Sequence, residues 1–179
     1  MKMEVKFVQC QLGHLEQLVD ISRKTFVDAF EKDNDPTDFK VYIEKAFASE
    51  TIAKEMSNPE TFFYFITIQD AIAAYVKLNV GNAQSDLQLK DSMELERIYV
   101  LSEYQGLGLG EQIVKKVKKL ALDQQKTLLW LGVWEHNQRG IQFYQRQGFQ
   151  KFGTHPYFIG SDEQTDWLMR FDLTTLYPK

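Results

Sequence analysis

The stretch QGLGLGEQIVKK, residues 105–116, holds the residues whose spacing most clearly indicates chemistry. Gly106, Gly108 and Gly110 alternate with other residues just before an amphipathic run that is typical of a helix. Glycines at this place let consecutive backbone N–H groups point to one spot, where the helix dipole adds about half a positive charge. Such a turn predicts an anion site, and a pyrophosphate fits it.

Two common phosphate-binding patterns do not fit the stretch. The dinucleotide fingerprint starting at Gly106 requires a third glycine where Glu111 stands. The P-loop requires Gly-Lys-Ser or Gly-Lys-Thr, and neither follows. The remaining pattern is Gln105-x-x-Gly108-x-Gly110, a turn that also occurs without a ligand, so the surrounding residues must decide its role.

This stretch resembles motif A of the GNAT superfamily of N-acetyltransferases, in which Gln or Arg, two residues, Gly, one residue and then Gly or Ala follow a strand similar to LERIYVL. The resemblance extends over residues 62–173, about the last two thirds of the chain. The downstream residues that fit the family, in order, are Asn137, Gly140, Phe143, Tyr144, Gly148 and Phe149. Gly140 replaces the usual Ala, which should weaken its helix by about 0.5–1 kcal/mol.

The resemblance implies an N-acetyltransferase that passes acetyl from acetyl-CoA to a primary amine by direct attack, without a metal. Backbone groups of residues 98–100 would pair with the pantetheine arm, and residues 105–110 would hold the pyrophosphate. Asn137 would contact the arm; Arg146 would meet a phosphate or be solvated. The implied cofactor-binding residues are Ile98, Tyr99, Val100, Gln105, Gly106, Leu107, Gly108, Leu109, Gly110, Asn137 and Arg146.

The attacking amine must lose a proton, because an ammonium with a pKa of about 10.4 costs roughly 4 kcal/mol to deprotonate at pH about 7.4. Glu94 and Glu96, at i and i+2 on the strand before the glycines, are candidate bases. Glu96 is favoured as the base because LERIYV resembles the polyamine-acetylating branch. Alternatively, Glu94 and Glu96 are both exposed strand charges, and Arg97 neutralises one of the two. Tyr144 occupies the family position of the acid that protonates the leaving thiolate.

The acceptor is less clear from the sequence. Residues 28–60 contain nine acidic residues and four lysines, a net charge of −5, which would attract a polycation or simply cover solvated helices. This region and LERIYV resemble the PaiA-like spermidine/spermine acetyltransferases, so a polyamine is the favoured acceptor. Another small amine or amino acid, a peptide amine, and a non-catalytic acyl-CoA-binding regulatory module remain alternatives.

The elements that must position these residues can be read from periodicity. Helices are expected at residues 14–30, after DNDPTD, from Ser49, after the glycines and at 137–148. Strands are expected at 5–8, 61–68, 71–80, 93–101, 128–134, 151–160 and 165–173. The apolar run LLWLGVW indicates a strand buried on both faces, and Trp130, Trp134 and Trp167 are expected in the core.

The order of elements predicts one α/β (α+β) domain over residues 1–179. By resemblance it has a GNAT fold with a mixed, mostly antiparallel sheet of about seven strands, splayed at the cofactor site and flanked by helices. Acetyl-CoA should enter between the strand ending at Leu101 and the strand ending at Trp134.

Composition excludes several other classes. A net charge of −4 disfavours a nucleic-acid binder, and the lysines at 115, 116, 118 and 119 are interpreted as a solvated helix face. The charged N-terminus matches neither a signal peptide nor a membrane span, so the cytoplasm is expected. His14, His136 and His155 lack metal-ligand spacing, and Cys10 is expected to be inert. The oligomeric state is open, and a homodimer is compatible with the sequence.

Overall fold

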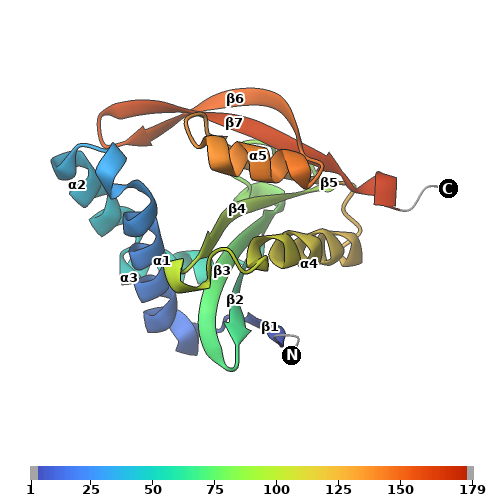
Figure 1. The fold of residues 1–179 in the computed structure, drawn as a ribbon, viewed down its shortest axis with the longest axis horizontal. Helices are drawn as coiled ribbons and strands as arrows, with labels where there is room; N and C mark the ends of the chain where they lie inside the picture. The colour runs from blue at the N-terminus through green and yellow to red at the C-terminus, as the bar shows by residue number, and fades with distance from the viewer. Residues whose placement is uncertain (1–3, 177–179) are drawn as a thin grey trace.

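The structure, a computed structural model, describes residues 4–176 (Figure 1). Its centre is a mixed seven-stranded sheet in the order β1-β2-β3-β4-β5-β7-β6. The strands are β1 (Val5–Gln9), β2 (Thr61–Ile68), β3 (Ala71–Val80), β4 (Ser92–Val100), β5 (Leu128–Trp134), β6 (Gln150–Ile159) and β7 (Asp162–Asp172). The helices are α1 (Leu15–Phe30), α2 (Pro36–Ala46), α3 (Ser49–Met56), α4 (Leu109–Asp123) and α5 (Gln138–Arg146). The predicted fold class is confirmed.

Helices cover both faces of the sheet (Figure 1). Alternate residues of β3 point to opposite layers: Tyr75 packs in the cluster formed with α1, α2 and α3, whereas Ala74 and Val76 pack in the cluster formed with α4 and α5. Helix α4 buries the apolar face that its periodicity predicts, including Ile113 and Val117. The two clusters fix the sheet between its helical layers.

The sheet opens between β4 and β5. These two strands are the parallel neighbours, and they pair only over Ser92–Glu94 with Leu128–Trp130. Beyond that point β4 continues to Val100 and pairs only with β3. The edge of β4 that faces β5 therefore carries backbone groups without strand partners, and the predicted splay lies between these two strands.

A β-bulge interrupts the pairing of β3 with β4 close to the splay. Lys77 pairs with Arg97 and Leu78 pairs with Leu95, so Glu96 is the extra residue. A bulge changes the direction of the side chains next to it. In this protein the carboxylates of Glu94 and Glu96 both accept a hydrogen bond from the side-chain amide of Asn79.

Helix starts are mostly as the sequence indicates. Asp35 caps α2, and its carboxylate accepts hydrogen bonds from the N–H groups of Thr37 and Asp38. Pro36 stands in the first turn, where its missing N–H costs nothing. Helix α3 begins at Ser49, as the sequence indicates, and Ala48 stands at its cap position.

Three expectations about burial are wrong. Trp134 is not a core residue but is half-buried and lines two cavities, whereas Trp130 is buried as predicted. Strand β5 is covered on both faces only over residues 129–131, because Gly132 is exposed. Lys118 is not simply solvated: its Nζ donates to the carbonyl of Gln147 at 2.6 Å and lies 3.5 Å from the ring centre of Phe171.

Several sequence features carry no site of their own. Burial raises the pKa of the Cys10 thiol to about 12, which makes it a poor nucleophile at neutral pH. Among residues 4–176, no three His, Cys, Asp or Glu side chains gather where they would hold a metal ion. None of the helices that the structure describes combines the length and the apolar character needed to cross a bilayer.

Candidate active site

The three glycines at the start of α4 have different physical roles. Gly106 and Gly108 adopt φ values of +77° and +72°, and no atom lies within 4 Å of the place where a Cβ would stand on either. Gly110 instead permits close packing, since its Cβ would lie 3.3 Å from Cζ of Phe143 on α5. Gln105 fixes the turn to the end of β4 by donating from Nε2 to the carbonyl of Val100 at 3.1 Å.

A groove of about 880 Å³ runs from this turn to the opening between β4 and β5. Every residue predicted to bind the cofactor lines it except Leu107, whose side chain is 47% exposed. Three cationic side chains also line the groove: Lys32, Arg139 and Arg146. Lys32 and Arg139 were not predicted from the sequence, because a single charge on a helix surface carries no pattern.

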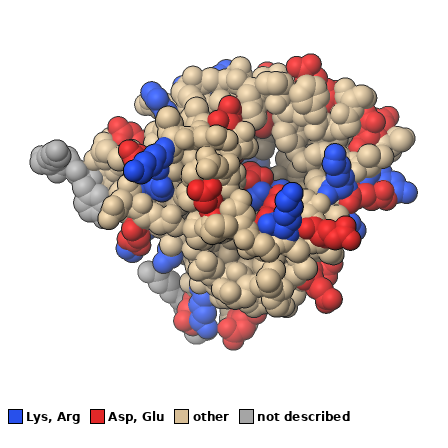
Figure 2. All heavy atoms as spheres, turned by 180° about the vertical axis from the view of Figure 1, so that it is seen from behind, with Lys and Arg blue, Asp and Glu red and all other residues tan. Residues whose placement is uncertain are grey.

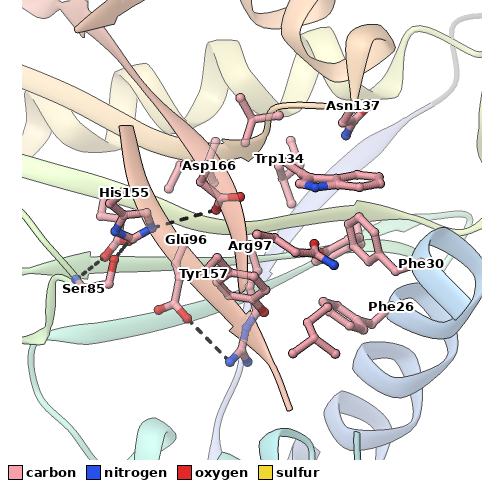
Figure 3. A pocket seen from close by; sticks show the side chains of 18 of the residues that line it. Phe26, Phe30, Ser85, Glu96, Arg97, Trp134, Asn137, His155, Tyr157 and Asp166 are labelled. Atoms are coloured by element: carbon pink, nitrogen blue, oxygen red, sulfur yellow. Dashed lines mark hydrogen bonds and ion pairs between the residues drawn. The ribbon is translucent and has the colours of Figure 1, made fainter. Parts of the chain in front are cut away.

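A second, smaller cavity of about 250 Å³ reaches the same opening from the other side. The two cavities share the residues Phe30, Ile98, Tyr99, Trp134, Asn137 and Tyr144. Nine Phe, Tyr and Trp side chains from both halves of the chain line the smaller cavity together with carboxylates: Phe26, Phe30, Tyr42, Phe47, Tyr99, Trp130, Trp134, Tyr144 and Tyr157. We call it the acceptor cavity. Figure 3 shows it from close by, with Phe26 and Phe30 on α1.

Tyr144 lies where the two cavities meet. Burial raises the pKa of its phenol above the ordinary value, so the hydroxyl keeps its proton at neutral pH. The start of helix α5, which carries it, is fixed by Asn137, whose Oδ1 accepts from the N–H of Gly140 at 2.9 Å. A Cβ on Gly140 would come within 2.7 Å of Nδ2 of Asn137, so an alanine at this position would require the Asn137 amide to shift.

Glu94 is buried in a network of hydrogen bonds. Its carboxylate accepts from Nδ2 of Asn79 at 3.0 Å, from the N–H of Ser85 at 2.9 Å and from the Ser85 hydroxyl. Burial, together with the nearby charge of Glu96, raises the pKa of Glu94. These contacts attach the loop after β3 to the floor of the acceptor cavity.

Glu96 belongs to a charged cluster with Glu55, Lys77 and Arg97. Lys77 Nζ lies 2.7 Å from Oε2 of Glu96 and 2.9 Å from Oε1 of Glu55. Arg97 Nη2 lies 3.5 Å from Oε1 of Glu96 (Figure 3). Burial alone would raise the pKa of Glu96, but Arg97 and Lys77 lower it below the ordinary value. Glu96 is therefore ionised and fully paired at neutral pH.

Sequence reasoning missed the third carboxylate of the acceptor cavity. Asp166 on β7 lines the cavity beside His155 on β6 (Figure 3). Both stand in stretches interpreted only as closing strands, and the register His155 to Asp166 that brings them together is a product of tertiary pairing. The one available signal was a carboxylate directly before the apolar residues of DWLMRF.

The acidic segment at residues 28–60 is partly used within the fold. Glu55 pairs with Lys77, Asp35 caps α2, and Asp38 accepts from the hydroxyl of Ser161 at 2.8 Å. Figure 2 shows carboxylates and basic side chains intermixed over the rear face. The segment's net charge thus overstates the field that a ligand would meet.

Comparison with known proteins decides the family. The profile of the acetyltransferase (GNAT) family matches residues 15–149 of the chain. The chain belongs to the GNAT family. It is therefore a GNAT-type N-acetyltransferase with acetyl-CoA as its acetyl donor, as the sequence motifs led us to expect.

Relatives support this assignment at different levels. An uncharacterized N-acetyltransferase of Lactobacillus delbrueckii subsp. lactis is 38% identical over 166 residues, 93% of this chain and 96% of the relative. A thialysine N-epsilon-acetyltransferase of Bos taurus is 45% identical over 56 residues, 31% of this chain and 33% of the relative. The crystal structure of the PaiA N-acetyltransferase from Thermoplasma acidophilum in complex with coenzyme A shares the fold, with a TM-score of 0.76 at 17% identity over 95% of this chain and 99% of that one.

Proposed function

We propose that this GNAT enzyme acetylates a primary amino group of a polyamine such as spermidine or spermine. The observation that carries the proposal is the acceptor cavity, where aromatic rings and carboxylates surround the point at which the donor groove arrives. Aromatic faces and negative charge both attract an ammonium, by about 0.5–2 kcal/mol for each cation–π contact. An alkyl amine with further charged groups suits such a lining.

Acetyl-CoA fits the larger groove in this proposal. The turn at residues 105–110 offers open backbone at two glycines with positive φ, which suits a pyrophosphate at the start of α4. Lys32, Arg139 and Arg146 provide charge for the remaining phosphate. The unpaired edge of β4 at residues 98–100 offers hydrogen bonds to the amide groups of the pantetheine arm, and one of its N–H groups would polarise the thioester carbonyl.

Tyr144 is proposed as the acid of the reaction. As the amine attacks the acetyl carbon and the C–S bond breaks, the Tyr144 hydroxyl gives its proton to the departing sulfur. After the attack the nitrogen still carries one proton that the amide product does not keep. The Tyr144 phenolate takes up this proton and becomes a phenol again. The buried phenol and its place between the two cavities support this role.

Glu96 and Glu94 remain proposed contributors at the amine side. A carboxylate with a lowered pKa holds a proton weakly, so the contacts of Glu96 favour attraction of the ammonium over proton abstraction. The base role predicted for either residue stays a prediction. Glu96→Gln should raise the KM for the amine if the residue binds it, and should lower kcat if it is the base.

The test is thiol release from acetyl-CoA by the purified protein, with spermidine, spermine, lysine, thialysine, small monoamines and a lysine-containing peptide as acceptors. Saturable turnover that is highest with the polyamines would support the proposal. Highest turnover with another amine would reject the polyamine and leave the transfer chemistry intact. Silence with every acceptor, while acetyl-CoA still binds, would favour the regulatory module.

A thialysine-like amino acid is the second candidate acceptor. The local match to a thialysine N-epsilon-acetyltransferase favours it, although that match spans only 56 residues. The acceptor panel separates the candidates, because an amino acid carries a carboxylate that the acidic residues of the cavity should repel. A homodimer also stays a prediction, and light scattering of the purified protein tests it.

A further inference from the structure

Asp166 is a carboxylate of the acceptor cavity that lies beside Trp134, a residue shared by the two cavities, and the roles proposed above do not use it. It pairs in register with Trp134 at the end of β5 and with His155 on β6. Its side chain is 17% exposed and lines the acceptor cavity, and Trp134 beside it lines the donor groove as well (Figure 3). An amine that attacks the acetyl group between β4 and β5 would therefore pass close to this carboxylate.

Gly132 makes room for the Asp166 carboxylate. A Cβ at position 132 would stand 3.1 Å from Oδ2 of Asp166, a tight contact that would require the carboxylate to move by a few tenths of an ångström. Gly132 lies in the interior of β5, where glycine weakens a strand and often marks a close approach of another group. The glycine in LLWLGVW thus permits the Asp166 side chain to lie across the strand.

A chain of titratable groups leads away from Asp166. Nε2 of His155 lies 4.0 Å from Oδ2 of Asp166, and Nδ1 of His155 lies 3.4 Å from Oδ2 of Asp86. The Asp86 side chain is 39% exposed. Its loop is held in place because Gln84 Oε1 accepts from the indole of Trp130 at 2.8 Å. A proton that reaches His155 at one ring nitrogen can leave from the other.

The three carboxylates of the cavity differ in their partners. Glu94 and Glu96 accept hydrogen bonds or pair with fixed cations, whereas no hydrogen bond from residues 4–176 reaches the Asp166 carboxylate, whose neighbour is His155. Burial raises the pKa of Asp166 to about 6, and His155 opposes that rise. The titratable and charged groups that line the cavity are Tyr42, Glu94, Glu96, Arg97, Tyr99, Tyr144, His155, Tyr157 and Asp166.

We propose that Asp166 is the general base of acetyl transfer and that His155 and Asp86 conduct its proton to solvent. The proposal rests on the amine acceptor of the proposed function. Asp166 takes one proton from the ammonium, directly or through a water, and the freed lone pair forms the C–N bond. The C–S bond breaks, and Tyr144 protonates the sulfur as described above. His155 then takes the proton from Asp166 at Nε2 through a water that bridges the 4.0 Å between them, and releases one at Nδ1 towards Asp86.

The test is the pH dependence of kcat/KM, measured by thiol release with spermidine and, in parallel, with thialysine. We expect Asp166→Asn to lower kcat about 10²–10⁴-fold, the usual contribution of a general base. The acidic limb near pH 6 should disappear with it, while the Kd for acetyl-CoA from calorimetry stays within twofold. His155→Gln and Asp86→Asn should lower kcat less, and high concentrations of a small buffer such as imidazole should restore part of the loss.

Two further variants separate a base from a structural residue. Asp172→Asn changes an exposed carboxylate at the C-terminal end of β7 and should leave the profile unchanged. Gly132→Ala should lower kcat through displacement of the Asp166 carboxylate, without removing any titratable group. An acceptor with a trifluoromethyl group on the carbon that carries its amino group is largely unprotonated at neutral pH, so Asp166→Asn should cost it much less turnover.

The proposal is overturned if Asp166→Asn keeps kcat within threefold of the wild type. It is also overturned if the acidic limb of the pH profile persists in Asp166→Asn and vanishes in Glu96→Gln. Failure of the acceptor proposal is recognised separately, because the wild type would then acetylate neither amine. NMR titration of the Asp166 carboxyl needs no acceptor. A titration midpoint near pH 6 in the wild type that shifts to lower pH in Gly132→Ala supports a buried base. A wild-type midpoint near the ordinary value of about 3.9 contradicts it.

Discussion

Lys77 Nζ lies 2.7 Å from Oε2 of Glu96, and the Lys77 side chain is only 6% exposed. The same ammonium lies 2.9 Å from Oε1 of Glu55. Lys77→Met would leave both carboxylates without this cation in a largely buried place. We expect the free energy of unfolding to fall by about 3 kcal/mol, as is usual when one partner of a buried ion pair is removed. Urea denaturation at pH 7 measures the loss.

Lys119→Met is the matched control for this prediction. Lys119 pairs with Asp123 at 3.1 Å on the surface of α4, where both side chains are more than half exposed. Such pairs contribute less than about 1 kcal/mol. Equal losses in the two variants would show that the Lys77 cluster does not contribute as a buried network.

Gly108→Ala tests the anion site at the start of α4. The φ of +72° should cost an alanine about 1 kcal/mol of stability, although no atom blocks its Cβ. The methyl group would stand where the pyrophosphate is proposed to approach, so we expect the Kd for acetyl-CoA to rise at least tenfold. Gly160→Ala, with a φ of +60° in the turn between β6 and β7, should lose stability and keep the affinity. Unchanged binding in Gly108→Ala would argue against the pyrophosphate site.

Tyr144→Phe removes the proposed acid and keeps the ring. We expect kcat to fall by about 10²–10⁴-fold with an unchanged Kd for acetyl-CoA, because the hydroxyl acts only as the C–S bond breaks. Tyr64→Phe, on β2 outside both cavities, is the control and should retain full turnover. Wild-type turnover in Tyr144→Phe would assign proton delivery to another group.

Asp166→Asn should also stabilise the protein at neutral pH. Burial raises the pKa of Asp166 to about 6, so the unfolded chain ionises this carboxyl at a lower pH than the folded chain does. The folded protein binds the extra proton between about pH 4 and 6, and its stability falls as the pH rises through that window. Above about pH 6 the buried charge of Asp166 lowers the free energy of unfolding by about 1–3 kcal/mol, and the uncharged amide of Asn would not cause this loss.

Denaturation midpoints at two pH values check this sign. The midpoint of Asp166→Asn should exceed that of the wild type at pH 7, and the difference should shrink towards pH 4, where the carboxyl is neutral in both states. A variant that is less stable than the wild type at pH 7 would show that Asp166 supports the fold through its charge.

The residues that line the groove proposed for acetyl-CoA could be named from the sequence because their signals are local. Gly106 and Gly108 need positive φ, and Asn137 and Tyr144 lie within one helical turn or two of each other, so short spacing carries the information. The predicted strands and helices follow the same local rules. Family membership, which these motifs indicate, then supplies the sheet and its splay.

The acceptor side could not be predicted, because it is assembled across the fold. Asp166, His155 and Asp86 come from two strands and a loop, and only the strand order brings them together. The burial of Lys77 between two carboxylates likewise depends on a bulge in the pairing of β3 with β4. Trp134 was placed in the core because its strand is apolar, and the gap beside that strand is a tertiary feature.

The short β4–β5 junction has a consequence for kinetics. The sheet consists of two parts, β1–β4 and β5–β7–β6. In the described chain they are joined by strand pairing only over residues 92–94 and 128–130, at one end of the opening. A donor bound in the opening would add hydrogen bonds between the two parts of the sheet. It should therefore slow amide hydrogen exchange in both β4 and β5. It would also complete a wall that the acceptor meets. The architecture therefore favours an ordered sequence in which the thioester enters first and the free thiol leaves last.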